Sequence, residues 1–514
     1  MIGISKDTTF KILMVLVSLA AIALVFFPTQ RARIGITPDS VQYIGTARNL
    51  IEGKGFLTYN NSPLLLWPPL YPIVLALFGF IFKRDPLLVA NLINSVLFGL
   101  IVFFSGTIAF KLTKKSFILA FIAALTVVFS IPFYGVTTMV FSETLFIFLI
   151  VLFFKFLDLF STDHRVKTLL ILAFITALAS LTRYIGVALI LVGMVCVFFT
   201  SKSKIKERIL HTGIFAILSS LPLSAWIIRN LIISGTFTGP RYISSFSFLD
   251  QFHSIAVSLF SWFSPKQFFD SQIFIAVIFF SIGLLIGILH KELNIRDVYQ
   301  STTLVALFTF LVLYIISLFM SARSGFGQLI DSRYLSPLFV PITLLFFTFV
   351  NHITNIFKER LRSGFVFPII VIVLLVLVSF PISTTIKNSE KLGSFRLGFN
   401  SQNIYDSSTL RFLLNQPFVV NDCTIYTNNP IQVDFLAHFP AKMSPAKTTN
   451  DFTPIVVEDI NLLKGSWPMQ QACLIWFNTI HNDSLYSISD LEKIVDLEVQ
   501  YSFDDGTIYR IVQK

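Results

Sequence analysis

The acidic side chain whose setting most suggests chemistry is Asp39, within the stretch ITPDSVQYIGTARNLIEGKGF at positions 36–56. Thr37 and Pro38 predict a helix start, because threonine caps a first turn and proline suits the first helical position. Gly53 marks the end of this helix. Asp39 then falls in the first turn, where the helix dipole favours an ionised carboxylate. Such a carboxylate can act as a general base toward a hydroxyl or an amine, or it can simply support the helix start.

Apolar residues recur along the same stretch at helical spacing, which predicts a helix lying along a membrane surface. They are Val41, Ile44, Ala47 and Ile51. Tyr43 follows Asp39 by one turn and shares its face, so we include it among the candidate substrate-binding residues.

Three arginines are candidates for binding a phosphate, because the planar guanidinium can donate two parallel hydrogen bonds to its oxygens. They are Arg183, Arg241 and Arg333. Tyr184 follows Arg183 and Tyr334 follows Arg333, and these two tyrosines are candidate substrate-binding residues as well. The alternative for each arginine is a membrane-interface anchor or a charge that sets topology.

Glu143 follows Ser142 at the start of a long apolar run, SETLFIFL. It has three possible roles: binding a divalent metal ion, orienting a substrate, or capping the helix together with Ser142. The three cysteines and seven histidines show no metal-ligand spacing. A structural zinc site is therefore not expected. A divalent metal ion bound by Glu143 is the one cofactor left open.

The elements that must position these residues are membrane helices. Of the 514 residues, 54% are hydrophobic and only 13% are charged, whereas about 25% are charged in a soluble domain. The formal net charge of +11 comes from basic residues at the ends of apolar runs, where they set topology. A nucleic-acid partner is therefore not predicted.

We expect about eleven transmembrane helices, with the N-terminus in the cytoplasm because basic loops alternate with loops of low positive charge. The expected spans lie near 10–27, 86–110, 116–133, 142–160, 167–182, 184–200, 209–228, 272–290, 301–320, 335–350 and 364–382.

Two stretches decide the number of crossings. Residues 70–82 are apolar, but a 13-residue helix covers only about 20 Å, so we expect a helix on or dipping into the outer face. Residues 168–199 surround Arg183, which would lie near the centre of a single span at a cost of about 3 kcal/mol or more. A hairpin with Arg183 at its outer tip avoids that cost.

The predicted division is a membrane domain, 1–382, whose first external loop is 28–85, and a small extracytoplasmic α/β domain, 383–514. Strand-like runs occur at 423–429, 472–478 and 497–512, the last being a hairpin with Asp505-Gly506 as its turn. Cys423 and Cys473 each open a strand, so a disulfide between them is possible in an oxidising compartment and is left open. In the external loop 229–271, four aromatic residues are candidates for an interfacial anchor: Trp262, Phe263, Phe268 and Phe269.

A series of motifs carries a resemblance to a known family. WPPLYP at 67–72, SETLFIFL at 142–149, LTRYIG at 181–186, AWIIRNLIISGTFTGPRY at 225–242 and RYLSPLFVP at 333–341 follow the Asp39 helix. In this order they resemble the GT-C membrane glycosyltransferases of the protein O-mannosyltransferase and lipid A aminoarabinose transferase type. The chain departs from the first subfamily at Ser40, where an acid is expected after Asp39, and from the second at Trp67, where a charge is expected.

The resemblance implies transfer of a sugar from a polyprenyl- or dolichyl-phosphate carrier to a glycolipid, polysaccharide or protein acceptor. The reaction would take place on the extracytoplasmic face of the cell (inner) membrane. It implies Asp39 as the catalytic base and Glu143 as a second acid. Hexosyl and pentosyl transfer are both left open, as are the stereochemistry and the oligomeric state. The alternatives are a flippase or transporter for a lipid-linked sugar, and an oligosaccharide ligase or polymerase. The absence of a sequence repeat argues against the transporter.

Overall fold

The chain is represented by a computed structural model containing two compact units, each described by itself. Unit 1 comprises residues 1–32 and 64–394, and unit 2 comprises residues 33–63 and 395–514. Residues 33–63 thus group with the C-terminal part, whereas the sequence-based division at 382/383 keeps them with the membrane helices. The functional division stays a prediction. The described residues are 5–200, 204–239, 246–265, 301–325, 329–361, 366–394, 407–416, 423–437, 439–447, 455–468 and 471–514.

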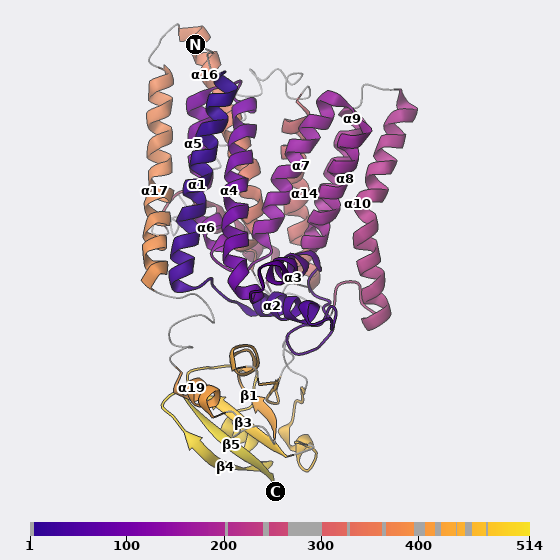
Figure 1. Ribbon diagram of the computed structural model, residues 1–514, viewed down its shortest axis with the longest axis vertical. Helices are drawn as coiled ribbons and strands as arrows, with labels where there is room; N and C mark the ends of the chain where they lie inside the picture. Colours follow the sequence, from indigo (N-terminus) through magenta and orange to yellow (C-terminus); the bar gives the residue numbers. More distant parts are fainter. Residues whose placement is uncertain are drawn as a thin grey trace. The chain divides into compact units, whose positions relative to one another are not determined.

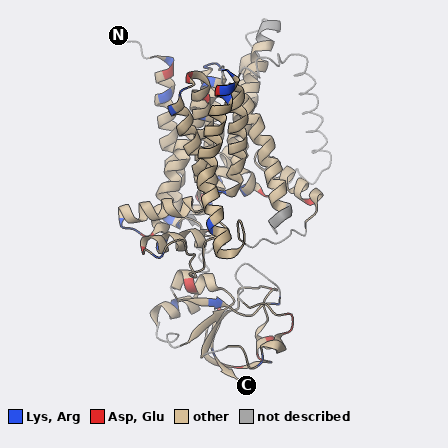
Figure 2. Cartoon of the chain, turned by 90° about the vertical axis from the view of Figure 1, so that its right-hand side faces the viewer, with Lys and Arg blue, Asp and Glu red and all other residues tan. Residues whose placement is uncertain are grey.

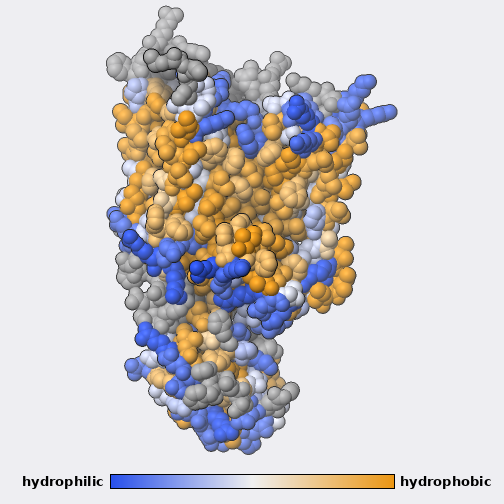
Figure 3. Space-filling view, in the orientation of Figure 1, coloured by the Kyte–Doolittle hydropathy of each residue, from blue (hydrophilic) through white to orange (hydrophobic). Residues whose placement is uncertain are grey.

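Unit 1 is a bundle of apolar helices (Figure 1), which confirms the predicted fold class of a helical polytopic membrane protein. Its long helices are α1 (Lys6–Ala32), α4 (Pro86–Leu112), α7 (Glu143–Asp163), α10 (Ile205–Ser234), α14 (Thr302–Gly325), α16 (Phe339–Leu361) and α17 (Val366–Ser394). Figure 3 shows a broad hydrophobic surface over these helices, which is the surface that lipid would cover.

The shorter helices of unit 1 account for the remaining apolar runs in its described part. They are α3 (Leu70–Phe82), α5 (Phe117–Val128), α6 (Ile131–Thr137), α8 (Val166–Thr182), α9 (Val187–Thr200) and α11 (Phe248–Ser261). Among the described residues, seven helices are long and apolar enough to cross a membrane, or eight if the bent pair α5 and α6 is one span. The expected span 272–290 lies outside the described residues, so the count of eleven stays a prediction.

Polar contacts in unit 1 show which helix ends lie at the same end of the bundle as the basic loops. Lys115, just after α4, forms an ion pair of 2.8 Å with Asp7 in the first turn of α1. Lys111 at the end of α4 binds Asp158 near the end of α7 at 2.6 Å, and Thr303 at the start of α14 donates to Asp158 at 3.0 Å. The basic loops after α4 and α7 therefore lie at the end of the bundle where α1 begins, and Figure 2 shows Lys and Arg grouped there.

The two stretches that decide the number of crossings form the predicted elements. Residues 70–82 form α3, a separate short helix that packs against α4 and α8. At Arg183 the backbone leaves the helical region, with φ −148° and ψ 134°. The helices on either side, α8 and α9, pack against each other. Arg183 thus lies at the turn between two helices and not in the middle of one.

Unit 2 contains a five-stranded sheet with the order β2-β1-β3-β5-β4. The strands β1 (Thr424–Thr427), β3 (Ala472–Phe477), β4 (Val495–Ser502) and β5 (Gly506–Gln513) match the strand-like runs in the sequence. The three-residue β2 (Ala441–Met443) was not predicted; it pairs in parallel with β1. The predicted α/β character of the C-terminal domain is therefore confirmed.

Side-chain contacts stabilise the sheet at both ends of its strands. Asp505, at the hairpin between β4 and β5, accepts hydrogen bonds from the Ser407 hydroxyl and from the backbone N–H and hydroxyl of Thr409. These bonds attach α19 (Ser408–Asn415) to the sheet. Cys423, directly before β1, forms a disulfide with Cys473 in the neighbouring strand β3. The sequence had left this disulfide open.

Unit 2 also contains α2 (Pro38–Ile51), the helix that carries Asp39. Thr37 is its N-cap: the Ser40 N–H donates to the Thr37 hydroxyl at 3.4 Å, and the Thr37 N–H donates to the Ser40 hydroxyl at 3.0 Å. Gly53 follows the helix with φ +76°, a conformation that favours glycine. The predicted start and end of this helix are therefore confirmed.

Candidate functional site

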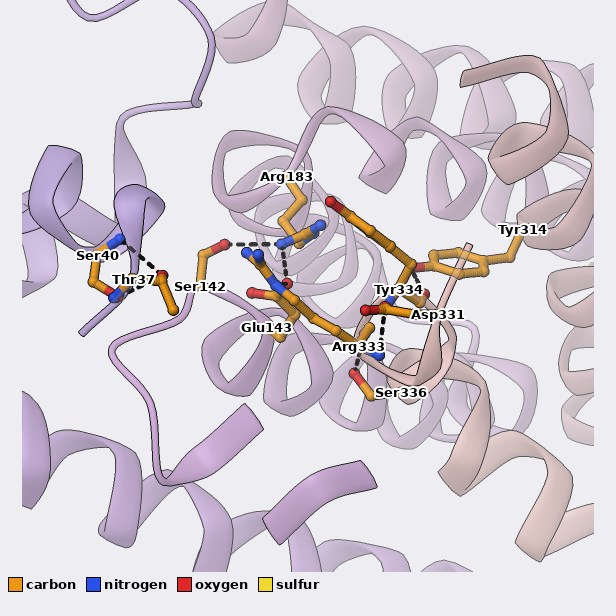
Figure 4. Close-up of polar contacts among 10 residues, drawn as sticks. All are labelled: Thr37, Ser40, Ser142, Glu143, Arg183, Tyr314, Asp331, Arg333, Tyr334 and Ser336. Atoms are coloured by element: carbon orange, nitrogen blue, oxygen red, sulfur yellow. Dashed lines mark hydrogen bonds and ion pairs between the residues drawn. The ribbon is translucent and has the colours of Figure 1, made fainter. Parts of the chain in front are cut away.

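The centre of the polar site in unit 1 is Glu143, the first residue of α7, whose side chain is fully buried. Its Oε1 atom accepts from Arg183 Nη1 at 2.7 Å and from Arg333 Nε at 2.5 Å. The three residues come from segments far apart in the sequence and point toward one another (Figure 4). We call them the Glu143 cluster.

Arg183 reaches the cluster because the chain turns there between α8 and α9. Its guanidinium also donates to the Ser142 hydroxyl at 3.2 Å, so it contacts two successive residues at the start of α7. The side chain is 15% exposed. A continuous helix through residue 183 would instead place this arginine within the apolar layer.

Arg333 lies in α15 (Ser332–Leu335), a single turn capped by Asp331, which accepts from the Arg333 N–H at 2.9 Å. The guanidinium carbon lies 3.7 Å from the centre of the Phe141 ring, a cation–π contact that adds to the ion pair. The segment before it is fixed by α11: the Ile330 N–H donates to Gln251 at 2.9 Å, and Trp262 Nε1 donates to the Ser332 hydroxyl at 3.1 Å.

The charges of the Glu143 cluster favour an anion. Two guanidiniums share one carboxylate, so the cluster carries a net charge of about +1. The second carboxylate oxygen, Oε2, is buried without a hydrogen-bond partner in the described part of the chain. A divalent cation does not fit beside two guanidiniums, and no group of three acidic, histidine or cysteine side chains occurs among the described residues.

Tyr184 connects the cluster to α10 and to Leu65, which lies at the start of the second part of unit 1 (64–394). Its hydroxyl donates to the Leu65 carbonyl at 2.8 Å and accepts from Trp226 Nε1 at 3.1 Å and Asn230 Nδ2 at 3.2 Å. These three bonds use the whole hydrogen-bonding capacity of a hydroxyl. Tyr184 therefore positions the turn that holds Arg183, and its role as a direct substrate contact stays a prediction.

Tyr334 lies beside Arg333, whose guanidinium carbon is 5.6 Å from the tyrosine ring centre. The Tyr334 carbonyl accepts from the hydroxyl of Tyr314, a fully buried residue of α14, at 3.1 Å. The third candidate arginine, Arg241, lies outside the described residues. The structure thus brings Glu143, Arg183 and Arg333 together, with Tyr184 and Tyr334 next to them.

Asp39 and Tyr43 belong to unit 2. Asp39 lies in the first turn of α2 and is partly buried, whereas Tyr43 is buried on the same helix. The structure gives Asp39 the expected setting at the positive end of a helix dipole. Its catalytic role, and a substrate-binding role for Tyr43, stay predictions.

Sequence reasoning missed several residues that build the site. Phe141, Ser142 as an arginine partner, Trp226, Asn230 and Tyr314 all contact it. Trp226 and Asn230 lie in the motif AWIIRN, four residues apart and therefore on one face of α10, which was a usable signal. Trp262 was predicted as a membrane anchor, but its side chain is 1% exposed and bonds to Ser332, so that prediction is wrong.

The fold resembles solved structures over nearly its whole length. ArnT from Cupriavidus metallidurans, bound to undecaprenyl phosphate, matches with a TM-score of 0.62 at 12% identity, covering 96% of this chain and 97% of that one. The Archaeoglobus fulgidus oligosaccharyltransferase, in complex with Zn and sulfate, matches with a TM-score of 0.54 at 13% identity, covering 97% and 72%. The chain has the GT-C fold.

The archaeal oligosaccharyltransferase AglB was also solved with an inhibitory peptide and a dolichol-phosphate. That structure matches with a TM-score of 0.54 at 11% identity, covering 92% of this chain and 69% of that one. No protein-family model matches the sequence, and no curated protein sequence matches it. At these identities the likeness concerns the fold, so the function has to be argued from the site.

Proposed function

We propose that the chain is a membrane glycosyltransferase that transfers a sugar from a polyprenyl- or dolichyl-phosphate carrier to an acceptor. The observation that carries this proposal is the Glu143 cluster, in which two arginines from different segments converge on one buried carboxylate. A GT-C fold alone allows several reactions. A site with two guanidiniums for one carboxylate, at a helix end of an apolar bundle, suits a phosphate whose lipid tail stays in the bilayer.

In this proposal Arg183 and Arg333 bind the phosphate oxygens of the donor. Their charges stabilise the lipid phosphate as it leaves with the electron pair of the broken bond between the sugar's anomeric carbon and the phosphate oxygen. Glu143 holds the two guanidiniums in place; without it, their mutual repulsion would separate them. Glu143 is therefore a positioning residue, and Tyr184 positions the turn that carries Arg183.

Asp39 is the proposed catalytic base. Its carboxylate would take the proton of an acceptor hydroxyl or amine while that group's electron pair forms the new bond to the anomeric carbon. The start of α2, with its Thr37 cap and Pro38, fixes the position of this residue on the helix. Glycolipid, polysaccharide and protein acceptors are all compatible with such a base.

The reaction is proposed for the extracytoplasmic face of the cell membrane. Two observations support this side. The basic loops after α4 and α7 lie at the end of the bundle where α1 begins, and Glu143 starts α7, so the cluster lies at the opposite end. The Cys423–Cys473 disulfide in unit 2 suits an oxidising compartment.

The test is a transfer assay with purified protein in lipid nanodiscs and polyprenyl phosphates that carry radiolabelled hexoses or pentoses. Mass spectrometry of the glycolipids from cells with and without the gene would identify the acceptor to use in this assay. We expect labelled sugar to move from at least one lipid-phosphate donor to that acceptor, and Arg333→Ala to abolish the movement. Transport of the intact donor across the membrane without any transfer would contradict the proposal.

A second candidate is an oligosaccharide ligase, favoured by the likeness to the archaeal oligosaccharyltransferase. It would use a lipid-linked oligosaccharide as the donor. Offering the protein monosaccharide-phosphate and oligosaccharide lipids side by side separates the two candidates. The low charge of the cluster, with two arginines partly neutralised by Glu143, favours a single phosphate over a pyrophosphate.

A further inference from the structure

Unit 2 contains a pocket of about 300 Å³ that the proposed donor chemistry does not use. It lies between the C-terminal half of α2, the loop that follows, and the short π-helix η5 (Ile431–Leu436). Seven of its lining residues can form hydrogen bonds or carry charge: Arg48, Asn49, Glu52, Lys54, Tyr59, Asn61 and Asp434. The volume is at the lower end of small-molecule sites, which suits one sugar-sized group.

The wall of this pocket is held by close packing. A Cβ atom on Gly45 would lie 2.6 Å from the backbone of Tyr59, so the loop rests directly on α2. The Asn49 side chain donates to the carbonyls of Leu57 and Thr58 at 3.1 and 2.8 Å. The loop that carries Tyr59 and Asn61 is therefore tied to the helix before any ligand binds, which lowers the entropic cost of binding.

The charge balance of the pocket favours an anion. The Arg48 guanidinium lies 4.8 Å from the centre of the Phe435 ring, which holds it in place. Lys54 pairs with Glu52 at 2.6 Å, which offsets part of its charge, but its ammonium has two more N–H donors with which to bind an anion. Burial raises the pKa of Asp434 to about 7, so near neutral pH this carboxyl is partly uncharged and can donate as well as accept a hydrogen bond.

We propose that this pocket binds a single acidic sugar unit, a monosaccharide that carries a carboxylate. Arg48 and Lys54 attract the carboxylate, while Tyr59, Asn61 and Asp434 bond to the ring hydroxyls. That this sugar belongs to the acceptor glycan rests on the proposed function; the binding of the sugar does not. The acceptor class is accordingly a glycan that contains an acidic sugar.

The test is saturation-transfer NMR on the full-length protein in detergent, with three probes: methyl β-glucuronide, methyl β-glucoside and inorganic phosphate. We expect the glucuronide to bind about tenfold or more tightly than the glucoside, because hydrogen bonds to a charged group are the stronger ones. Equal binding of the two sugars would overturn the acidic-sugar assignment. Phosphate competing as well as the glucuronide would show a simple anion site and overturn it too. This assay needs no transfer, so its failure is distinct from failure of the proposed function.

Variants locate the binding. Arg48→Gln should lower glucuronide affinity about tenfold, whereas Lys464→Gln, an exposed basic residue of unit 2 that does not line the pocket, should leave it unchanged. Lys54→Gln changes a side chain that is 53% exposed and so tests the same charge without endangering the fold. Unchanged affinity in both pocket variants would place the sugar elsewhere.

The pH dependence supplies an independent readout. The groups around Asp434 are Arg48, Glu52, Lys54 and Tyr59, together with the Ala441 backbone, which bonds to it. Lowering the pH from 8 to 6 protonates Asp434 and removes a negative charge beside the ligand's carboxylate, so the glucuronide should bind more tightly. Asp434→Asn should bind tightly at both pH values. If its affinity still changes with pH as in the unmodified protein, Asp434 does not face the sugar.

Discussion

Arg333 donates from Nε to Oε1 of Glu143 at 2.5 Å, although 190 positions separate the two residues. The contact joins the start of α7 to α15, and Arg183 brings the turn between α8 and α9 to the same oxygen. One carboxylate thus fixes three segments of unit 1. Because it is fully buried, its removal would leave two guanidiniums without their counter-charge.

Replacing Glu143 should therefore destabilise unit 1 strongly. Glu143→Ala should lower the free energy of unfolding by about 3–5 kcal/mol, the usual cost of breaking a buried ion pair by removing one partner. Glu143→Gln keeps the shape and should cost less. Thermal unfolding of the detergent-solubilised protein measures both.

A matched control lies on the same helix. Asp158, near the other end of α7, pairs with Lys111, whose side chain is 56% exposed. The Asp158 side chain is 19% exposed, and asparagine can still accept from Thr303, so Asp158→Asn should cost about 1 kcal/mol, the upper end for ion pairs in contact with solvent. If Glu143→Ala and Asp158→Asn melt at the same temperature, Glu143 does not hold the three segments of unit 1 together.

Replacing Arg183 or Arg333 by lysine should lower the affinity for the lipid-phosphate donor. Arg183→Lys and Arg333→Lys keep the charge but lose the planar fork, so donor affinity should fall about tenfold, and the alanine variants should lose more. Binding of a fluorescent polyprenyl phosphate to purified protein measures this, together with the rate of transfer. Arg229→Lys serves as the comparison, since Arg229 stacks on Trp226 at 4.4 Å and bonds to the Leu64 carbonyl. Donor affinity unchanged in both alanine variants would remove these arginines from the donor site.

Local signals allowed much of this site to be predicted. Thr37 and Pro38 predicted the start of α2, and the cost of a buried charge predicted the break at Arg183. Both arguments concern residues close together in the sequence. They required no knowledge of what the segments pack against.

The convergence on Glu143 could not be predicted in the same way. Glu143, Arg183 and Arg333 were each chosen separately, and nothing in their spacing indicates that one carboxylate binds both arginines. Trp262 shows the same limit: a tryptophan in a loop between spans suits a membrane interface, but packing of α11 buries it against Ser332. Residues 33–63 grouping with the C-terminal part is also a long-range result.

The disulfide of unit 2 should be present in the protein isolated from cells. Without reduction, alkylation under denaturing conditions should label one thiol, that of Cys196, and after reduction it should label three. Replacing Cys423 and Cys473 by serine should lower the stability of unit 2 by about 2–4 kcal/mol, because a bridge across 50 residues limits the unfolded chain. Three thiols labelled without reduction would show that the bridge does not form in the cell.

The chain should have its N-terminus in the cytoplasm and its C-terminus outside. A reporter that is active only outside the cytoplasm, fused after Lys514, should be active. The same reporter inserted in the basic stretch 201–208 should be silent, because positively charged loops stay inside. Activity only of a cytoplasmic reporter at the C-terminus would mean that the number of crossings differs by one, with 70–82 or the undescribed stretch near 272–290 as the source.

The change that tests the chemistry most directly is Asp39→Asn. Asparagine has the size of aspartate and is accepted in the first turn of a helix, so α2 and its Thr37 cap should form as before. It cannot accept a proton from the acceptor, and losing a general base lowers the rate by about 10²–10⁴-fold. Transfer from a labelled lipid donor should therefore fall by that factor, while donor binding and the melting temperature stay unchanged. Asp85→Asn is the matched control, because Asp85 caps α4 by accepting from the Leu87 N–H at 2.9 Å, a task that asparagine performs equally well. It should transfer sugar at the normal rate. If folded Asp39→Asn protein also does so, Asp39 is not the base, and Glu143 becomes the next acid to test.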